Sequence, residues 1–99
     1  MANPTHATLA TFGMDLSREA EQRAVLDNVI VPGVMASPGV VSGHWTLDRG
    51  SSESIVLLTF DSLEHAEAMA ANVRGNAENQ RAVGIELLSI RILEVTVAA

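Results

Sequence analysis

The chain has 99 residues, 47% of them hydrophobic, and a formal net charge of -6, which together indicate one globular domain, residues 1–99, with ample apolar material for a core. The negative balance argues against nucleic acid as a partner, because phosphate binding needs clustered basic side chains, and the absence of cysteine excludes disulfides and fits a cytoplasmic protein. We expect neither a signal peptide nor a membrane span, since residues 1–14 lack a basic opening and no apolar run approaches about 18 residues.

Small and β-branched side chains dominate residues 5–14, which predicts a first strand. Ser17 is then expected to cap a helix. Apolar residues at helical spacing mark the buried side of this helix, opposite Arg18 and Gln22: Val25, Leu26, Val29 and Ile30. Pro32 should stop or kink it, with one further turn over residues 34–37 between two Pro-Gly pairs.

Residues 40–48 and 54–60 predict two strands of an antiparallel hairpin, because only a short polar loop separates them. The second of these strands is apolar on both faces, with Val56, Leu58 and Phe60 on one and Ile55 and Leu57 on the other. A chain this short has few elements with which to cover both faces. If its helices share one face, the simplest cover for the other is a second copy, so we expect a homodimer through the sheet face.

A second helix is predicted from Asp61, which forms a capping-box-like start with Glu64. Gly75 is a candidate early break in this helix. The buried stripe is expected at every third or fourth residue: Leu63, Ala66, Ala70, Val73 and Ala77. The last strand, residues 85–97, changes its apolar face part-way along. Either a bulge near residues 91–93 or packing of its second half on a neighbouring subunit explains the change, and we favour the second.

The predicted order βαββαβ indicates an α+β protein with a ferredoxin-like plan, a four-stranded antiparallel sheet with two helices on one face. Residues 38–45 (PGVVSGHW), residues 56–62 (VLLTFDS) and Gly84 before the final strand resemble the dimeric α+β barrel superfamily and its antibiotic-biosynthesis-monooxygenase-type members. This resemblance implies protomers that pair sheet to sheet to form a dimeric α+β barrel. It also implies a small-molecule pocket between each protomer's helices and sheet.

Members of that superfamily include cofactor-independent monooxygenases and haem-degrading enzymes. The haem degraders use an Asn on strand one, a Trp, and a His late in helix two, and neither Trp45 nor His65 matches by position. The corresponding stretches here offer other residues: Ala10 or Thr11 in the first strand and Asn76 or Asn79 after the second helix. The resemblance therefore disfavours haem degradation, and we expect no cofactor.

Four residues are candidates for a site. His44 is the catalytic candidate, because a neutral imidazole can accept a proton from a phenolic substrate, although a structural histidine is the alternative. Trp45, on the opposite face, is expected to stack on a planar ligand unless it only packs. Asn72 would orient a ligand carbonyl, or else serve the helix end. Arg91, in a strand among apolar residues, would bind the ligand or form an ion pair with Glu94 or Glu86.

The three histidines lack metal-ligand spacing, so no metal site is predicted. An RNA-recognition module shares the element order but needs exposed aromatics and a basic surface, whereas this chain has 3% aromatic residues. The first functional hypothesis is a dimer that binds a hydrophobic small molecule and acts as a cofactor-independent monooxygenase on an aromatic or polyketide-like compound. The alternative is a non-catalytic, stress-related or interaction module.

Overall fold

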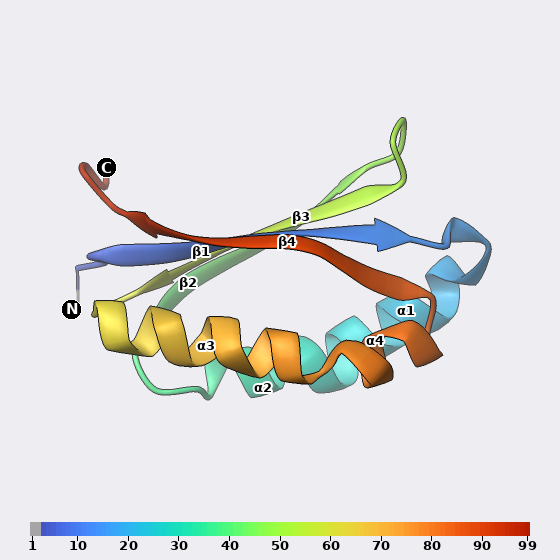
Figure 1. Cartoon of the computed structure of the whole chain (residues 1–99), viewed down its shortest axis with the longest axis horizontal. Coiled ribbons are helices and arrows are strands. Elements are labelled where there is room, and N and C mark those ends of the chain that lie inside the picture. Colours follow the sequence, from blue (N-terminus) through green and yellow to red (C-terminus); the bar gives the residue numbers. More distant parts are fainter. Residues whose placement is uncertain (1–2) are drawn as a thin grey trace.

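A computed structural model describes residues 3–99 and confirms the α+β fold with a single antiparallel sheet. The four strands lie in the order β2-β3-β1-β4, with bounds β1 (His6–Met14), β2 (Val40–Asp48), β3 (Glu53–Phe60) and β4 (Ile85–Glu94). All helices lie on one face of the sheet, called here the covered face, and the other face is uncovered (Figure 1). Within residues 3–99, no helix is both long and apolar enough to cross a membrane.

The first helical segment, residues 16–35, runs from β1 to β2 as four consecutive pieces: η1 (Leu16–Arg18), α1 (Glu19–Val25), the π-helical turn η2 (Leu26–Ile30) and α2 (Val31–Met35). The predicted Ser17 cap is wrong, because the Asp15 carboxylate accepts the hydrogen bond from the Ser17 backbone N–H at 3.1 Å. Pro32 does not stop the helix either. It falls in the first turn of α2, where a missing N–H is tolerated, directly after the wider hydrogen-bonding turn of η2.

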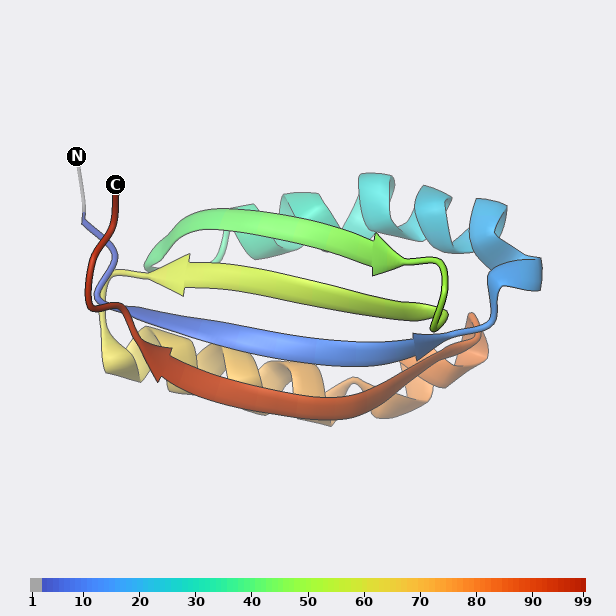
Figure 2. The same cartoon turned by 90° about the horizontal axis from the view of Figure 1, so that it is seen from above.

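The second helical segment, residues 63–82, consists of α3 (Leu63–Gly75) and α4 (Ala77–Ala82), so the break at Gly75 is confirmed. The helix cap is Ser62 and not Asp61, since the Ser62 hydroxyl accepts from the His65 backbone N–H at 3.2 Å. Figure 2 shows that the two helical segments lie along opposite edges of the sheet, the first beside β2 and the second beside β4.

Alanines bring α3 close to the sheet. Ala66 and Ala70 are completely buried, as the predicted stripe requires. Leu63, assigned to the same stripe, is 44% exposed, so that part of the prediction is wrong. It opens the first turn of α3, and the buried contacts begin one turn later with Ala66 and Met69.

The irregularity in β4 lies earlier than expected. Thr11 pairs with Ser89 and Phe12 pairs with Leu87, which leaves Leu88 as the extra residue of a bulge. The strand then ends at Glu94 and does not continue to residue 97. The predicted bulge at residues 91–93 is therefore wrong in position.

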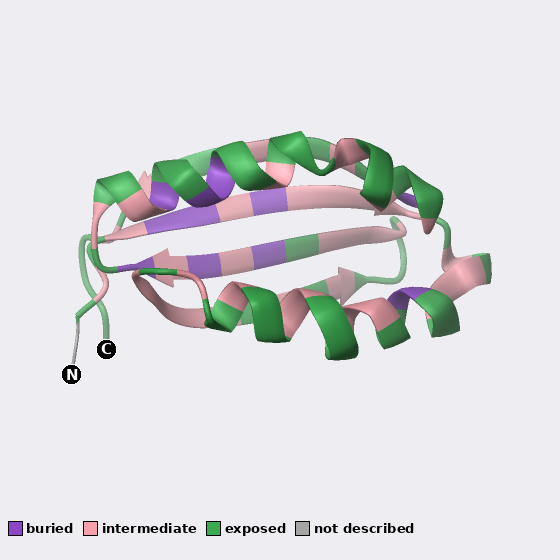
Figure 3. Ribbon diagram, turned by 90° about the horizontal axis from the view of Figure 1, so that it is seen from below, coloured by how far each residue is buried: buried purple, intermediate pink, exposed green. Residues whose placement is uncertain are grey.

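The two-faced character of β3 is confirmed, and it organises the core. Val56, Leu58 and Phe60 are buried beneath the helices, while Ile55 and Leu57 lie on the uncovered face, and Figure 3 shows this alternation along the strand. The core is small and centres on β3 and α3. The partner that would cover the uncovered face stays a prediction.

Candidate ligand-binding site

A large cavity of about 710 Å³ lies between the two helical segments and the covered face of the sheet. Its floor includes Thr8 and Ala10 of β1, whose short side chains leave space at the centre of the sheet. The predicted apolar stripe of the first helical segment borders this cavity and is not packed into the core. It consists of Val25, Leu26, Val29 and Ile30. Its position at the cavity explains why Val29 is 65% exposed. The cavity therefore has apolar walls on the β2 side.

Trp45 and Asn72 both line the large cavity, from opposite sides. Trp45 lies on β2 and pairs with Val56 on the covered face, where it is half-buried. Asn72 lies on α3, on the other side of the cavity. The fold thus brings Trp45 and Asn72, two of the predicted ligand-binding residues, to one cavity.

Amides form part of the polar lining, together with hydroxyl-bearing and charged side chains. Asn72, Asn76 and Asn79 come from the second helical segment, and Gln22 comes from α1. Gln22 was expected on the solvent side of its helix, yet it is only 4% exposed. Its Nε2 donates to the carbonyl oxygens of residues 15 and 83 at 2.8 and 3.0 Å, so this side chain ties α1 to the start of β4. Helical periodicity alone carries no signal for that long-range contact.

One ion pair joins the first helical segment to the β2–β3 turn at the edge of the large cavity. Arg49 donates to both carboxylate oxygens of Glu19, at 2.9 and 2.8 Å. This bidentate hydrogen bond holds the pKa of Glu19 below its usual value. No local sequence pattern indicates this ion pair, because its two residues are far apart along the chain.

His44 and Arg91 stand at the two ends of one row across the uncovered face. His44 pairs with Leu57, Leu57 with Leu9, and Leu9 with Arg91. Both end residues are exposed, and neither borders the large cavity. The structure therefore separates the candidate base His44 from the candidate stacking residue Trp45 by the thickness of the sheet.

The expected ion pair of Arg91 with Glu94 or Glu86 does not form among residues 3–99, where four salt bridges are found and none involves Arg91. Successive residues of a strand point to opposite faces, and Arg91 shares its face with apolar Leu9. Its guanidinium is left for solvent or for a partner that covers this face.

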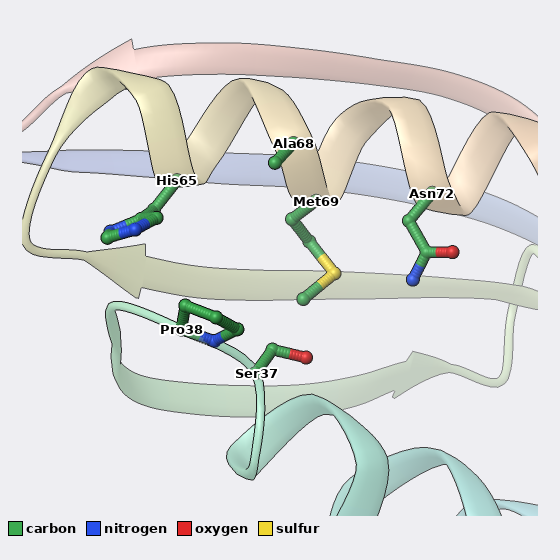
Figure 4. Close-up of a pocket in the computed structure, with 6 residues that line it drawn as sticks. All are labelled: Ser37, Pro38, His65, Ala68, Met69 and Asn72. Atoms are coloured by element: carbon green, nitrogen blue, oxygen red, sulfur yellow. The ribbon is translucent and has the colours of Figure 1, made fainter.

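A side recess of about 200 Å³ adjoins the large cavity, and the residues around it come from the α2–β2 connection and α3: Ser37, Pro38, His65, Ala68, Met69 and Asn72 (Figure 4). The His65 Nδ1 lies 2.6 Å from the Asp61 carboxylate. That hydrogen bond holds the pKa of Asp61 below its usual value. His65 was not among the predicted site residues, although its spacing from Asp61, one helical turn apart, indicates that the two side chains can meet.

The described part of the chain holds no group of three or more His, Cys, Asp or Glu side chains that would bind a metal ion. Haem iron needs an axial ligand, most often a histidine. No histidine is found in the lining of the large cavity, and His65 lines only the adjoining side recess. The large cavity itself therefore offers no histidine ligand to a haem.

A scan against protein-family models found no match, and a search of the curated proteins also found none. Solved structures are similar to the chain over nearly its whole length. A candidate antibiotic biosynthesis monooxygenase from Deinococcus radiodurans matches with a TM-score of 0.74 and 15% identity, over 95% of each chain. The chain shares its fold with antibiotic-biosynthesis-monooxygenase-like proteins.

Two further neighbours have ligands named with them. The haem degrader MhuD of Mycobacterium tuberculosis, with two haems bound in its active site, matches with a TM-score of 0.70 and 16% identity, over 95% of this chain and 98% of that one. A monooxygenase from Streptomyces coelicolor in complex with nanaomycin D matches with a TM-score of 0.63 and 12% identity, over 97% and 89%. The resemblance drawn from the sequence motifs is thus confirmed as a likeness of fold.

Proposed function

We propose that this protein binds a planar aromatic or polyketide-like compound in the large cavity. The observation that carries the proposal is the volume of about 710 Å³, because small-molecule pockets typically measure about 300–1,000 Å³. Apolar side chains, one indole and a few amides give such a ligand both contact area and orienting hydrogen bonds. Trp45 and Asn72 are the two residues to which we assign ligand contact.

The activity we propose is cofactor-independent monooxygenation. In such a reaction one oxygen atom of O₂ enters the product and the other leaves as water with two substrate hydrogens, so the substrate itself supplies the electrons. The likeness in fold to two monooxygenases supports this assignment. The alternative, a non-catalytic module whose own side chains fill the space between helices and sheet, is disfavoured by the size of the cavity.

We further propose a cytoplasmic homodimer that forms through the uncovered face. Leu9, Ile55 and Leu57 place apolar surface at the centre of this face, and a second copy of the chain would bury it. His44 and Arg91 then belong to the edges of the dimer contact and not to the ligand. The cysteine-free composition supports the cytoplasmic location.

A binding screen with planar phenols and quinones, read by Trp45 fluorescence, tests the proposal. Compounds that quench the signal are then titrated by calorimetry against Trp45→Leu, with His44→Gln on the opposite face as the matched control. We expect Trp45→Leu to weaken binding about tenfold, equivalent to about 1.4 kcal/mol, and His44→Gln to leave it unchanged. A flat fluorescence response to every compound would contradict the proposal. Oxygen uptake without added flavin or metal then tests the activity.

A further inference from the structure

The side recess and the large cavity are two parts of one space. Ser37, Met69 and Asn72 line both of them. A ligand that fills the large cavity therefore lies next to the remaining wall of the recess, which Pro38, His65 and Ala68 form.

His65 belongs to the face of α3 that looks onto this space. His65, Met69 and Asn72 follow one another at four and three residues, which places them on one side of a helix. Figure 4 shows the Met69 and Asn72 side chains directed from α3 toward the side of the Ser37–Pro38 connection, with the His65 ring on the same side of the helix but leaning back toward its N-terminal end. A ligand contact on Asn72 and one on His65 thus come from the same helical face.

Two neighbours fix the His65 imidazole before any ligand arrives. Asp61 lies 2.6 Å from Nδ1, and because its lowered pKa keeps the carboxylate charged, a neutral imidazole at this position places its proton on Nδ1 and its lone pair on Nε2. Gly39 packs against the ring: with a φ of 79°, it leaves room where a Cβ would lie 2.1 Å from Nδ1. Its carbonyl also accepts from the Asp61 N–H at 2.9 Å, which completes the support.

We propose that His65 is the general base of this site and that Asp61 is its positioning residue. The Nε2 atom accepts the proton of an acidic ligand hydroxyl, a phenol or an enol. The ligand is left as an anion, and the Asp61 carboxylate stabilises the imidazolium. The side chain of His65 is 40% exposed, so the proton passes on to water. This inference rests on the proposed function, because it requires that the ligand occupy the large cavity.

The test uses alizarin, 1,2-dihydroxyanthraquinone, whose visible absorption band moves when a hydroxyl ionises. Binding is followed by Trp45 fluorescence, and ionisation by absorbance, at a pH where the free probe is about half ionised, so that the anion-to-neutral ratio of the bound probe is compared with that of the free probe. The wild-type protein should show the spectrum of the anion on binding. His65→Gln should bind the probe yet lower the bound anion-to-neutral ratio about tenfold, which is one unit of pKa. His44→Gln, on the uncovered face, is the control and should keep the wild-type spectrum.

The role of Asp61 has its own readout. In ¹⁵N NMR of the labelled protein, His65 should be the tautomer protonated at Nδ1, and Asp61→Asn should weaken that preference and the anion signal together. A His65 tautomer protonated at Nε2 in the wild type would overturn the inference, even if every variant at His65 failed to fold. Probe binding without ionisation overturns the inference alone. Failure of the wild-type protein to bind alizarin and every other phenol or quinone of the screen overturns both the inference and the proposed function.

Discussion

The indole of Trp45 packs against Gly43, which precedes it by two residues on the same face of β2. A Cβ built at Gly43 would lie 2.8 Å from Cζ3 of the indole and 2.8 Å from Cδ2 of Leu58. Since real Cβ atoms do not approach so closely, only glycine at this position lets the ring occupy its place in the cavity wall.

Gly43→Ala should therefore displace the indole and lower the free energy of unfolding by about 1–3 kcal/mol, as overpacking does. Urea denaturation gives the free energy, and the emission maximum of Trp45 reports the displacement. Gly33→Ala is the matched control, because nothing lies within 4 Å of its added Cβ in α2, and a helical alanine should be neutral or stabilising by up to about 1 kcal/mol. An unchanged emission maximum in Gly43→Ala would show that the ring is not held in this way.

Leu57→Arg tests the dimer through the uncovered face. Leu57 sits in the middle of that face, between His44 and Leu9 in neighbouring strands, so a partner would bury the new charge without a counter-ion. Sedimentation should show a dimer for the wild type and a monomer for the variant. Leu63→Arg, on the exposed start of α3, should stay dimeric. A monomeric wild type at micromolar concentration would reject the dimer outright.

Phe60→Ala should be among the most destabilising single changes in the chain. Phe60 is completely buried at the end of β3, so its removal leaves a cavity in the small core, at a cost of about 3–5 kcal/mol. Leu63→Ala, at a position that is 44% exposed, should cost less than about 1 kcal/mol. Urea denaturation of the two variants distinguishes them, and an equal loss in both would mean that the core lies elsewhere.

Acid should destabilise the protein through its hydrogen-bonded carboxylates. The pKa values of Glu19 and Asp61 are lowered in the folded state, by hydrogen bonds from Arg49 and His65 respectively. Their contribution to stability is thus complete above the unfolded-state pKa values of about 4 and is lost as the pH falls through the folded-state values. When unfolding is measured from neutral pH downward, the urea concentration at the midpoint should decrease once the pH is below about 5.

Glu19→Gln should make that acid dependence shallower, because it removes one of the linked carboxylates. Glu78→Gln on α4 is the control, since Glu78 forms no salt bridge among residues 3–99. Identical slopes for the wild type and Glu19→Gln would indicate that the Glu19–Arg49 pair contributes nothing in solution.

Local sequence patterns predicted the strands well because the faces of a strand alternate residue by residue. The burial of Phe60 and the exposure of Ile55 both follow from that alternation. The bulge at Leu88 depends instead on the register between β4 and β1, which no single strand encodes. In the same way, Gln22 is buried because carbonyl groups 61 and 62 residues further along the chain accept its hydrogen bonds.

The candidate site was predicted only in part for the same reason. Alternation on β2 correctly placed Trp45 and His44 on opposite faces, and helical spacing put Asn72 on α3. Whether the covered face bounds a cavity depends on the distance between the two helical segments. That distance is a property of the whole fold. The pairing of Asp61 with His65 was overlooked because the helix start was assigned to Asp61 when Ser62 is the cap.

The short side chains of Thr8 and Ala10 set the depth of the large cavity at the middle of the sheet, and this affects how its ligand range can change during evolution. A bulkier residue at either position would take space from a guest molecule while every helix stayed where it is. A single substitution at either position would therefore be enough to adapt the cavity to a smaller ligand. Adaptation to a larger ligand would require changes in the helical segments, because the residues of the floor are already small.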